Sequence, residues 1–264
     1  MGYVWVVGSR ALLDHPLLSE RFFFPKPDPV HTPWIVEGGA GPLLGFRNAP
    51  HGGPTLLHFH GNGEFVADWA GRFTDRLVAK GLDVFLGEYR GYGGSAGQPC
   101  FASMLDDALA TADATGVPPE RLVLYGRSIG SIFALHVAAE RPVAGLIIES
   151  GIGEVLPLLL RRVQPGELGV EPRVLEEAVA GSLNHRAKME ATRCPVLVMH
   201  ALRDGVLQPE EARSLAGWAG ERAELVLFEQ GNHNTIHFRN WDEILRRVIE
   251  FTHAAAGGEP HGSP

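Results

Sequence analysis

A serine lies between two glycines where a short apolar stretch passes directly into a helical pattern, in the segment LVLYGRSIGSIFALHVAAE. The stretch 122–125 has the composition of a buried strand, and residues 129–139 repeat at helical spacing. A turn that joins a strand to a helix so tightly leaves no room for side chains two residues before and after the serine, which explains Gly126 and Gly130. The segment therefore predicts a strand, a sharp turn that presents Ser128, and a helix.

The pattern G-x-S-x-G at such a junction predicts a nucleophile elbow, in which the hydroxyl stands at the carboxyl end of a sheet. The helix start also supplies unpaired backbone N–H groups and the positive end of a dipole. A serine that only caps the helix is the alternative. The strand-turn-helix context favours the elbow for Ser128.

Short apolar runs alternate with longer amphipathic segments along the chain. The expected strands are 43–46, 55–59, 84–86, 122–125, 146–148, 196–199 and 225–228. The expected helices are 64–80, 101–115, 129–139, 209–218 and 241–255. This alternation predicts one α/β domain over residues 1–264, with a mainly parallel sheet and helices on both faces.

One interval breaks the rhythm, because about forty residues, 151–193, separate two expected strands. They carry EVLPLLLRRVQPGELGVEPRVLEEAVAG, residues 154–181, which predicts two short helices joined by a turn rich in Pro and Gly. Insertions of this size often act as lids, so we expect a cap, with an ordinary long crossover as the alternative. Residues 257–264 are small and polar and predict a flexible tail.

Composition excludes several classes of function. The net charge is −8 and no stripe of Lys or Arg is present, so nucleic acid is not an expected partner. Cys100 and Cys194 lie far apart and predict buried free thiols rather than a disulfide or a metal site. Residues 3–7 are too few and lack the flanks of a signal peptide, and no segment is apolar over the ~20 residues that a membrane span needs. We therefore expect a cytoplasmic protein that needs no cofactor.

A serine hydroxyl becomes a nucleophile only when a base removes its proton and an acid orients that base. Asp204 follows the expected strand 196–199, and His233 follows 225–228. The order Ser128, Asp204, His233 is the order that an elbow of this kind requires, with each residue at the end of its own strand.

Other residues compete for these roles. Glu149 follows the strand 146–148 and is a reserve for the acid, whereas His237 falls where a helix begins and is expected to be packed. His58 and His60 share one face of a strand and could bind a metal, but no further ligand accompanies them, so we expect no metal site.

The segment HFHGNGEF follows the strand 55–59 and enters a helix. This is the place from which an oxyanion hole takes its second backbone N–H. We assign the two donors to the backbone amides of Asn62 and Ile129. A glycine-rich turn that only caps the helix is the alternative.

Together the segments HFHGNGE, EYRGYGGSAGQP, YGRSIG, CPVLVMHALRDGVL and GNHN resemble the serine α/β-hydrolase superfamily, in particular its BEM46-like and ABHD13/ABHD17-like branch. The resemblance runs from about Leu43 to Phe251. It implies Ser128 as nucleophile, Asp204 and His233 as its relay, and the Asn62 and Ile129 amides as oxyanion donors.

It also implies that Arg90 and Tyr92 brace the site rather than react. Two departures stand out: Ala201 where the family often has Gly, and HGNGEF in place of HGNAGN. The second departure places Phe65 and Trp69 at the expected pocket entrance.

The sequence thus predicts a hydrolase of carboxylic esters or thioesters that works through an acyl-serine and takes a small-molecule ester or acyl substrate. Phe65, Trp69, Leu158 and Leu159 are the expected substrate-binding residues, although the leucines could instead pack the insertion on the sheet. An amidase or peptidase with the same triad is the main alternative, with Arg161 and Arg162 as candidates for a charged subsite. A non-catalytic protein of the same fold is less favoured because Ser, Asp and His are all present. The oligomeric state is left open between monomer and homodimer.

Overall fold

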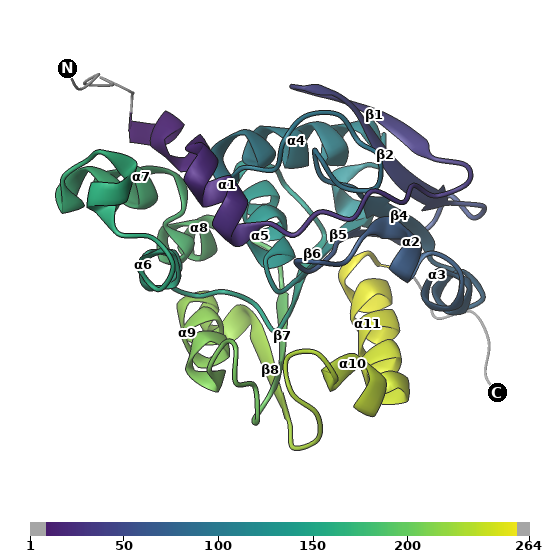
Figure 1. Cartoon of the computed structure of the whole chain (residues 1–264). Coiled ribbons are helices and arrows are strands. Elements are labelled where there is room, and N and C mark those ends of the chain that lie inside the picture. The colour runs from purple at the N-terminus through teal and green to yellow at the C-terminus, as the bar shows by residue number, and fades with distance from the viewer. Residues whose placement is uncertain (1–8, 258–264) are drawn as a thin grey trace.

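The computed structural model describes residues 9–257, and within them eight strands form a single sheet (Figure 1). The strands are β1 (Trp34–Gly38), β2 (Gly41–Asn48), β3 (Thr55–Phe59), β4 (Asp83–Gly87), β5 (Leu122–Arg127), β6 (Gly145–Glu149), β7 (Val196–Ala201) and β8 (Ala223–Phe228). Their order across the sheet is β1-β2-β4-β3-β5-β6-β7-β8. All seven expected strands are present.

The sheet is parallel from β4 to β8, and β2 pairs antiparallel with both β4 and β1. The central strands β3, β4, β5, β6 and β7 are buried along their whole length, which is why they read as continuous apolar runs. The predicted α/β fold with a mainly parallel sheet is confirmed.

Helices cover both faces of the sheet (Figure 1). They are α1 (Pro16–Phe22), α2 (Val66–Trp69), α3 (Arg72–Val78), α4 (Phe101–Ala114), α5 (Gly130–Glu140), α6 (Val155–Leu160), α7 (Pro172–Ser182), α8 (His185–Ala191), α9 (Pro209–Ala219), α10 (Ile236–Arg239) and α11 (Trp241–Ala255). On one face α4, α5, α8 and α9 pack side by side, and α2, α3 and α11 contact the sheet from the other.

Each face has its own hydrophobic core, because successive side chains of a strand point to opposite sides. On β5, Leu124 packs under α5 with Phe133, whereas Val123 and Tyr125 pack under α3 and α11 with Phe73. Cys100 and Cys194 are buried free thiols, as predicted.

Two details differ from the expectation. The strand β1 was not predicted, because it is an edge strand in which only Val36 is buried and its apolar signal is weak. The expected helix 64–80 is broken into α2 and α3 at Ala70 and Gly71, where Gly71 has a φ of +89° that favours glycine.

The two short helices predicted for 154–181 are α6 and α7, joined by a turn that contains the 3-10 helix η3 (Pro165–Leu168), and α8 follows them within the insertion 151–193. α7 packs against the 3-10 helix η1 (Ser9–Asp14), and α8 packs against α5 and α9. Arg21 donates to the carbonyl of Arg162 over 2.6 Å, and Arg162 donates to the carbonyl of Arg21 over 2.7 Å. These contacts join the insertion to the N-terminal helix α1. The role of the insertion 151–193 as a cap stays a prediction.

Within residues 9–257 no helix is long and apolar enough to cross a membrane. The apolar run 3–7 and nearly all of the expected tail 257–264 lie outside the described residues.

The close packing at Gly130 can be tested by substitution. A Cβ on Gly130 would stand 2.1 Å from the carbonyl oxygen of Phe59, whereas a Cβ on Gly181 in α7 would meet nothing within 4 Å. We expect Gly130→Ala to lower the free energy of unfolding by about 1–3 kcal/mol, because backbone must move. Gly181→Ala is the control and should stabilise by up to about 1 kcal/mol, since Ala is the better helix former. Urea unfolding measures both, and equal effects of the two variants would contradict this account.

Candidate active site

Ser128 stands on the turn between β5 and α5 with a φ of +51°, a conformation that non-glycine residues seldom adopt. Gly126 and Gly130 make the turn possible. A Cβ on Gly126 would lie 2.6 Å from the Cα of Ser131, and one on Gly130 would collide with the end of β3. Residues held in such sparsely populated backbone conformations cluster where chemistry occurs.

A continuous path of hydrogen bonds leads away from this serine. Ser128 Oγ lies 2.9 Å from His233 Nε2, and His233 Nδ1 lies 2.7 Å from Asp204 Oδ2. Ser128 and His233 are each 8% exposed, and Asp204 is 3% exposed. The structure therefore brings together the three residues that were predicted from three different strand ends.

Asp204 is held firmly as a carboxylate. Its Oδ1 accepts hydrogen bonds of 2.9 Å from the backbone amides of Val206 and Leu207. Burial alone would raise the pKa of this carboxyl, but the hydrogen bond with His233 and the two amides lower it below its ordinary value. An ionised Asp204 fixes the proton of His233 on Nδ1, which leaves Nε2 free to accept the proton of Ser128.

Glu149, the reserve acid, is bound elsewhere. Its carboxylate has no exposed surface and meets Tyr125, Arg127 and His237. His237 is packed, as expected, with its ring against those of Trp69 and Trp241. Of the two candidate acids, Asp204 is the one that is hydrogen-bonded to the imidazole of His233.

The backbone amides of Asn62 and Ile129 lie at the ends of β3 and β5, and among residues 9–257 neither donates a hydrogen bond. The peptide group between Gly61 and Asn62 is anchored through its carbonyl, which accepts from the Glu64 amide over 3.2 Å and lies 2.8 Å from His60 Nδ1. Because the C=O and N–H of a trans peptide point in opposite directions, this anchoring turns the Asn62 amide away from His60.

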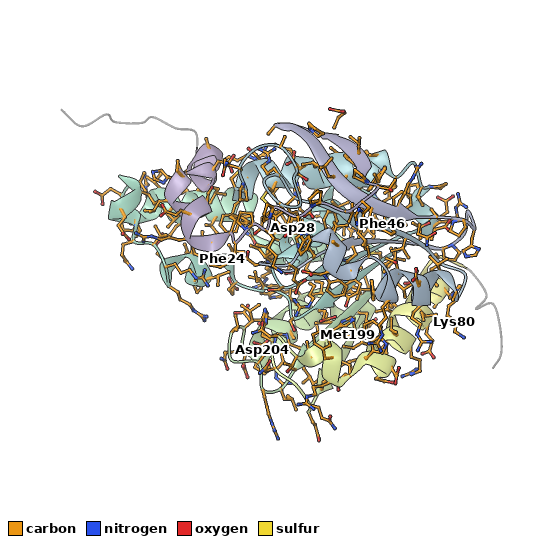
Figure 2. All side chains as sticks on the ribbon, turned by 45° about the vertical axis from the view of Figure 1, so that its right-hand side comes forward. Phe24, Asp28, Phe46, Lys80, Met199 and Asp204 are labelled. Carbon is orange, nitrogen blue, oxygen red and sulfur yellow. The ribbon has the colours of Figure 1, made fainter. Side chains whose placement is uncertain are left out.

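The side chain of Asn62 has a different task. Its Nδ2 donates to the carbonyl of Phe22, while its Oδ1 accepts from the Phe24 amide over 3.0 Å and from the Tyr92 hydroxyl over 2.9 Å. Asn62 thus ties the segment after α1 to the loop after β3. Phe24, labelled in Figure 2, leaves 51% of its surface exposed beside this loop.

His58 and His60 do not share an environment. His60 Nε2 is 2.7 Å from Glu88, and although burial would lower the pKa of His60, the Glu88 carboxylate raises it. The His58 ring packs between Trp69 and Tyr125, and burial lowers its pKa well below the ordinary value. In residues 9–257 no group of three or more His, Cys, Asp or Glu side chains could hold a metal ion.

The four expected substrate-binding residues have unequal positions. Phe65 is half-buried with the Lys26 ammonium 5.0 Å from its ring centre. Trp69 is buried and donates from Nε1 to Glu64 over 3.0 Å. Leu159 has no exposed surface and packs in the core with Leu158 partly buried against it, so the structure places these leucines in the packing of the insertion.

Arg161 and Arg162, the candidates for a charged subsite, both contact backbone carbonyls. Arg161 donates to the carbonyl of Val206 over 3.4 Å. Arg162 donates to Arg21 and lies over the rings of Phe22 and Phe24.

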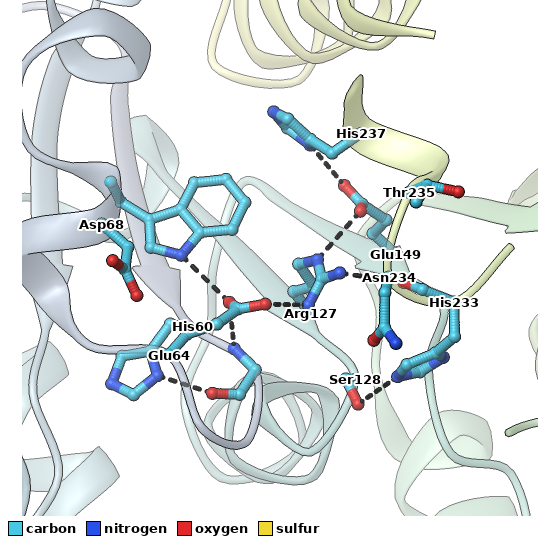
Figure 3. A network of polar contacts seen from close by, with 12 residues as sticks. His60, Glu64, Asp68, Arg127, Ser128, Glu149, His233, Asn234, Thr235 and His237 are labelled. Atoms are coloured by element: carbon cyan, nitrogen blue, oxygen red, sulfur yellow. Dashed lines mark hydrogen bonds and ion pairs between the residues drawn. The ribbon is translucent and has the colours of Figure 1, made fainter. Parts of the chain in front are cut away.

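A buried ionic network that the sequence did not predict lies next to the site (Figure 3). Arg127, directly before Ser128, lies between the carboxylates of Glu64 and Glu149 and also donates to the backbone carbonyl of His233 over 2.9 Å. Two signals could have pointed to it: Arg127 is part of the elbow, and Glu64 belongs to the departure HGNGEF.

Comparison with known proteins finds similarity to hydrolases. Residues 53–165 match the family described as serine aminopeptidase, S33. The uncharacterised protein YfhR of Escherichia coli K12 is 28% identical over 227 residues, which cover 83% of this chain and 74% of YfhR. Human alpha/beta hydrolase domain-containing protein 17B is 23% identical over 209 residues, which cover 78% of this chain and 68% of that protein.

A solved structure shares the fold. The esterase RhEst1 from Rhodococcus sp. ECU1013 superimposes with a TM-score of 0.67 at 18% identity, covering 85% of this chain and 99% of that one. The chain therefore shares its fold with this solved structure.

The buried carboxylate of Glu149 predicts an acid-dependent loss of stability. Burial would raise the pKa of Glu149, but His237 and Arg127 lower it to about 2 from its ordinary value of 4.5. Because the folded-state pKa is the lower one, the carboxylate stabilises the fold above pH 4.5, and this contribution is lost as the pH falls toward about 2. We expect Glu149→Gln to lower the free energy of unfolding at pH 7 by roughly 3–5 kcal/mol, since Arg127 loses a buried partner.

Urea unfolding at pH 7 and at pH 4 measures the effect, and the loss of stability between these two values should be smaller in Glu149→Gln than in the wild type. Glu176→Gln, an exposed change on α7, is the control. A Glu149→Gln variant with the wild-type dependence on pH would contradict the assignment.

Proposed function

Because the chain belongs to the α/β-hydrolase superfamily, we propose that it is a serine hydrolase that cleaves carboxylic esters or thioesters through an acyl-serine intermediate. One observation carries the proposal: the unbroken hydrogen-bonded path from Ser128 through His233 to Asp204 at the carboxyl edge of the sheet. Each residue of this path comes from a different strand end, and a purely structural role would not require that convergence.

The proposed reaction begins when Ser128 Oγ attacks the substrate carbonyl and His233 Nε2 takes its proton. The ionised Asp204 holds the imidazole in the required tautomer and stabilises the imidazolium that forms. His233 then gives the proton to the leaving alcohol or thiol. In the second half His233 deprotonates a water molecule that attacks the acyl-serine; the bond to Ser128 Oγ then breaks, the carboxylic acid leaves, and His233 returns the proton to Ser128 Oγ.

The negative charge of each tetrahedral intermediate needs donors in a site that excludes water. The backbone amides of Asn62 and Ile129 are the proposed pair, and both lack a partner among residues 9–257. Loss of one such donor typically costs about 10²–10³ in turnover. The N-terminus of α5 adds the positive end of its dipole to the same place.

The preference for esters rests on apolar surface near the site. Phe24 is exposed beside the loop that carries Asn62, and Phe65, directly before α2, is half-buried. Such an entrance suits a medium-sized apolar acyl or aryl group, and RhEst1 is described as an esterase. The proposal includes a cytoplasmic location, a small-molecule substrate and a cap role for part of 151–193.

An amidase or peptidase is the second candidate, favoured by the family description serine aminopeptidase. The same hydrogen-bonded path would serve it, because an acyl-serine is common to both reactions. It would need a charged subsite for a peptide terminus. Arg161 and Arg162 each donate to a backbone carbonyl at an exposed position, whereas aromatic side chains lie beside the loop of Asn62, and we therefore favour the ester hydrolase.

The test is a series of nitrophenyl esters of increasing acyl length together with the matching nitroanilide. We expect esters to be cleaved faster than the anilide at every length, because apolar side chains lie near the site and an alcohol is a better leaving group than an amine. Ser128→Ala should reduce turnover by about 10⁶-fold, since the nucleophile is lost. A Ser128→Ala variant with wild-type rates would refute the mechanism, and an anilide cleaved faster than every ester would establish the second candidate.

A further inference from the structure

Arg127 is buried, and its guanidinium uses three nitrogens on three different segments. Nε donates to Glu149 over 3.1 Å, at the end of β6. Nη1 donates to Glu64, in the loop after β3. Nη2 donates to the backbone carbonyl of His233, in the loop after β8, over 2.9 Å. Only 7% of the Arg127 side chain is exposed, so water competes little for these contacts.

Glu64 passes this connection to the proposed oxyanion donor. Its Oε2 accepts from the Gly61 amide over 2.8 Å and from Trp69 Nε1 over 3.0 Å, and its own amide donates to the Gly61 carbonyl. Glu64 therefore forms hydrogen bonds with both the N–H and the C=O of Gly61. Since the Gly61 carbonyl and the Asn62 amide belong to one peptide group, the direction of the Asn62 N–H depends on the position of Glu64.

The elbow itself is part of the same arrangement. Arg127 directly precedes Ser128, and the amide of Ser128 donates to the carbonyl of Glu149 over 2.9 Å. One guanidinium thus connects the loop of the proposed oxyanion donor, the loop of the proposed base and the strand next to the nucleophile (Figure 3). A planar guanidinium presents its donors in a fixed fork, so it can set distances between its acceptors.

Building on the proposed function, we propose that Arg127 and Glu64 are positioning residues that fix the Asn62 amide and the His233 imidazole relative to Ser128. Neither side chain touches the reacting atoms. Their contribution is geometric, because a displacement of about 1 Å in a catalytic group can cost about 10²-fold in rate. The buried location explains why the arrangement is firm: the carboxylates and the guanidinium compensate one another where the effective dielectric constant is low.

Two variants remove separate parts of the connection. Glu64→Gln keeps the shape of the side chain but removes the charge that pairs with Arg127 and weakens the hold on Gly61. Arg127→Lys keeps the charge but cannot reach three acceptors with one ammonium. Glu176→Gln and Arg213→Lys, both at exposed positions, are the matched controls.

The first readout is kinetic, with a nitrophenyl ester as substrate. We expect kcat of each variant to fall about 10- to 100-fold while KM changes by less than about threefold, because the affected contacts form in the transition state. The affinity for an arylboronic acid, which adds to the serine and mimics the tetrahedral intermediate, should fall by the same factor as kcat. The kcat of the double variant should be no lower than that of the more impaired single variant, since both substitutions act through one connection.

The second readout is amide hydrogen exchange, which does not depend on activity. Glu64→Gln should speed exchange in 60–65, and Arg127→Lys should speed it both there and in 231–236, with the remainder of the sheet unchanged. The proposal is overturned if kcat of both variants stays within about twofold of the wild type, if only KM rises, or if exchange in these segments is unaltered.

Different results would contradict the proposed function and the positioning role. If Ser128→Ala is inactive while Glu64→Gln and Arg127→Lys behave like their controls, the positioning role is wrong and the proposed function stands. If Ser128→Ala keeps wild-type turnover, the proposed function fails and the positioning role fails with it.

Discussion

The contact between the turn at Gly130 and the end of β3 is the constraint on which the site depends. Only a hydrogen fits at Gly130, because the carbonyl of Phe59 occupies the place of a Cβ. This close approach brings the loop that carries Asn62 next to the turn that carries Ser128. The unusual φ of Ser128 belongs to the same turn and holds its hydroxyl toward His233. The sheet thus positions the loops at its carboxyl edge, and the residues proposed to react lie in those loops.

Two groups of buried charged side chains flank the turn that carries Ser128. Asp204 and His233 form one group at the ends of β7 and β8. Glu64, Arg127 and Glu149 form the other (Figure 3), in contact with Trp69 of α2 and His237 of α10. Burying so many ions is costly unless every one of them is paired. The pairing of the second group makes a firm support for the first.

Much of this could be predicted from the sequence because the signals are local or ordered along the chain. Buried parallel strands give continuous apolar runs, and Ser128, Asp204 and His233 follow three of them in the required order. The edge strand β1 has one buried residue and gave no such signal. The role of Glu64 depends on its contact with Arg127, sixty-three positions away, and no periodicity records a contact of that kind. The chain order favoured Asp204 over Glu149 as the partner of His233, and the distances agree with that choice.

The central claim is that Ser128 carries the acyl group during the reaction. Mass spectrometry of the protein after reaction with a fluorophosphonate, followed by peptide mapping, tests it most directly. The account predicts one adduct per chain, on Ser128, and none in Ser128→Ala. An adduct on neighbouring Ser131 or Ser150, or ester turnover in a protein that gains no adduct, would contradict it.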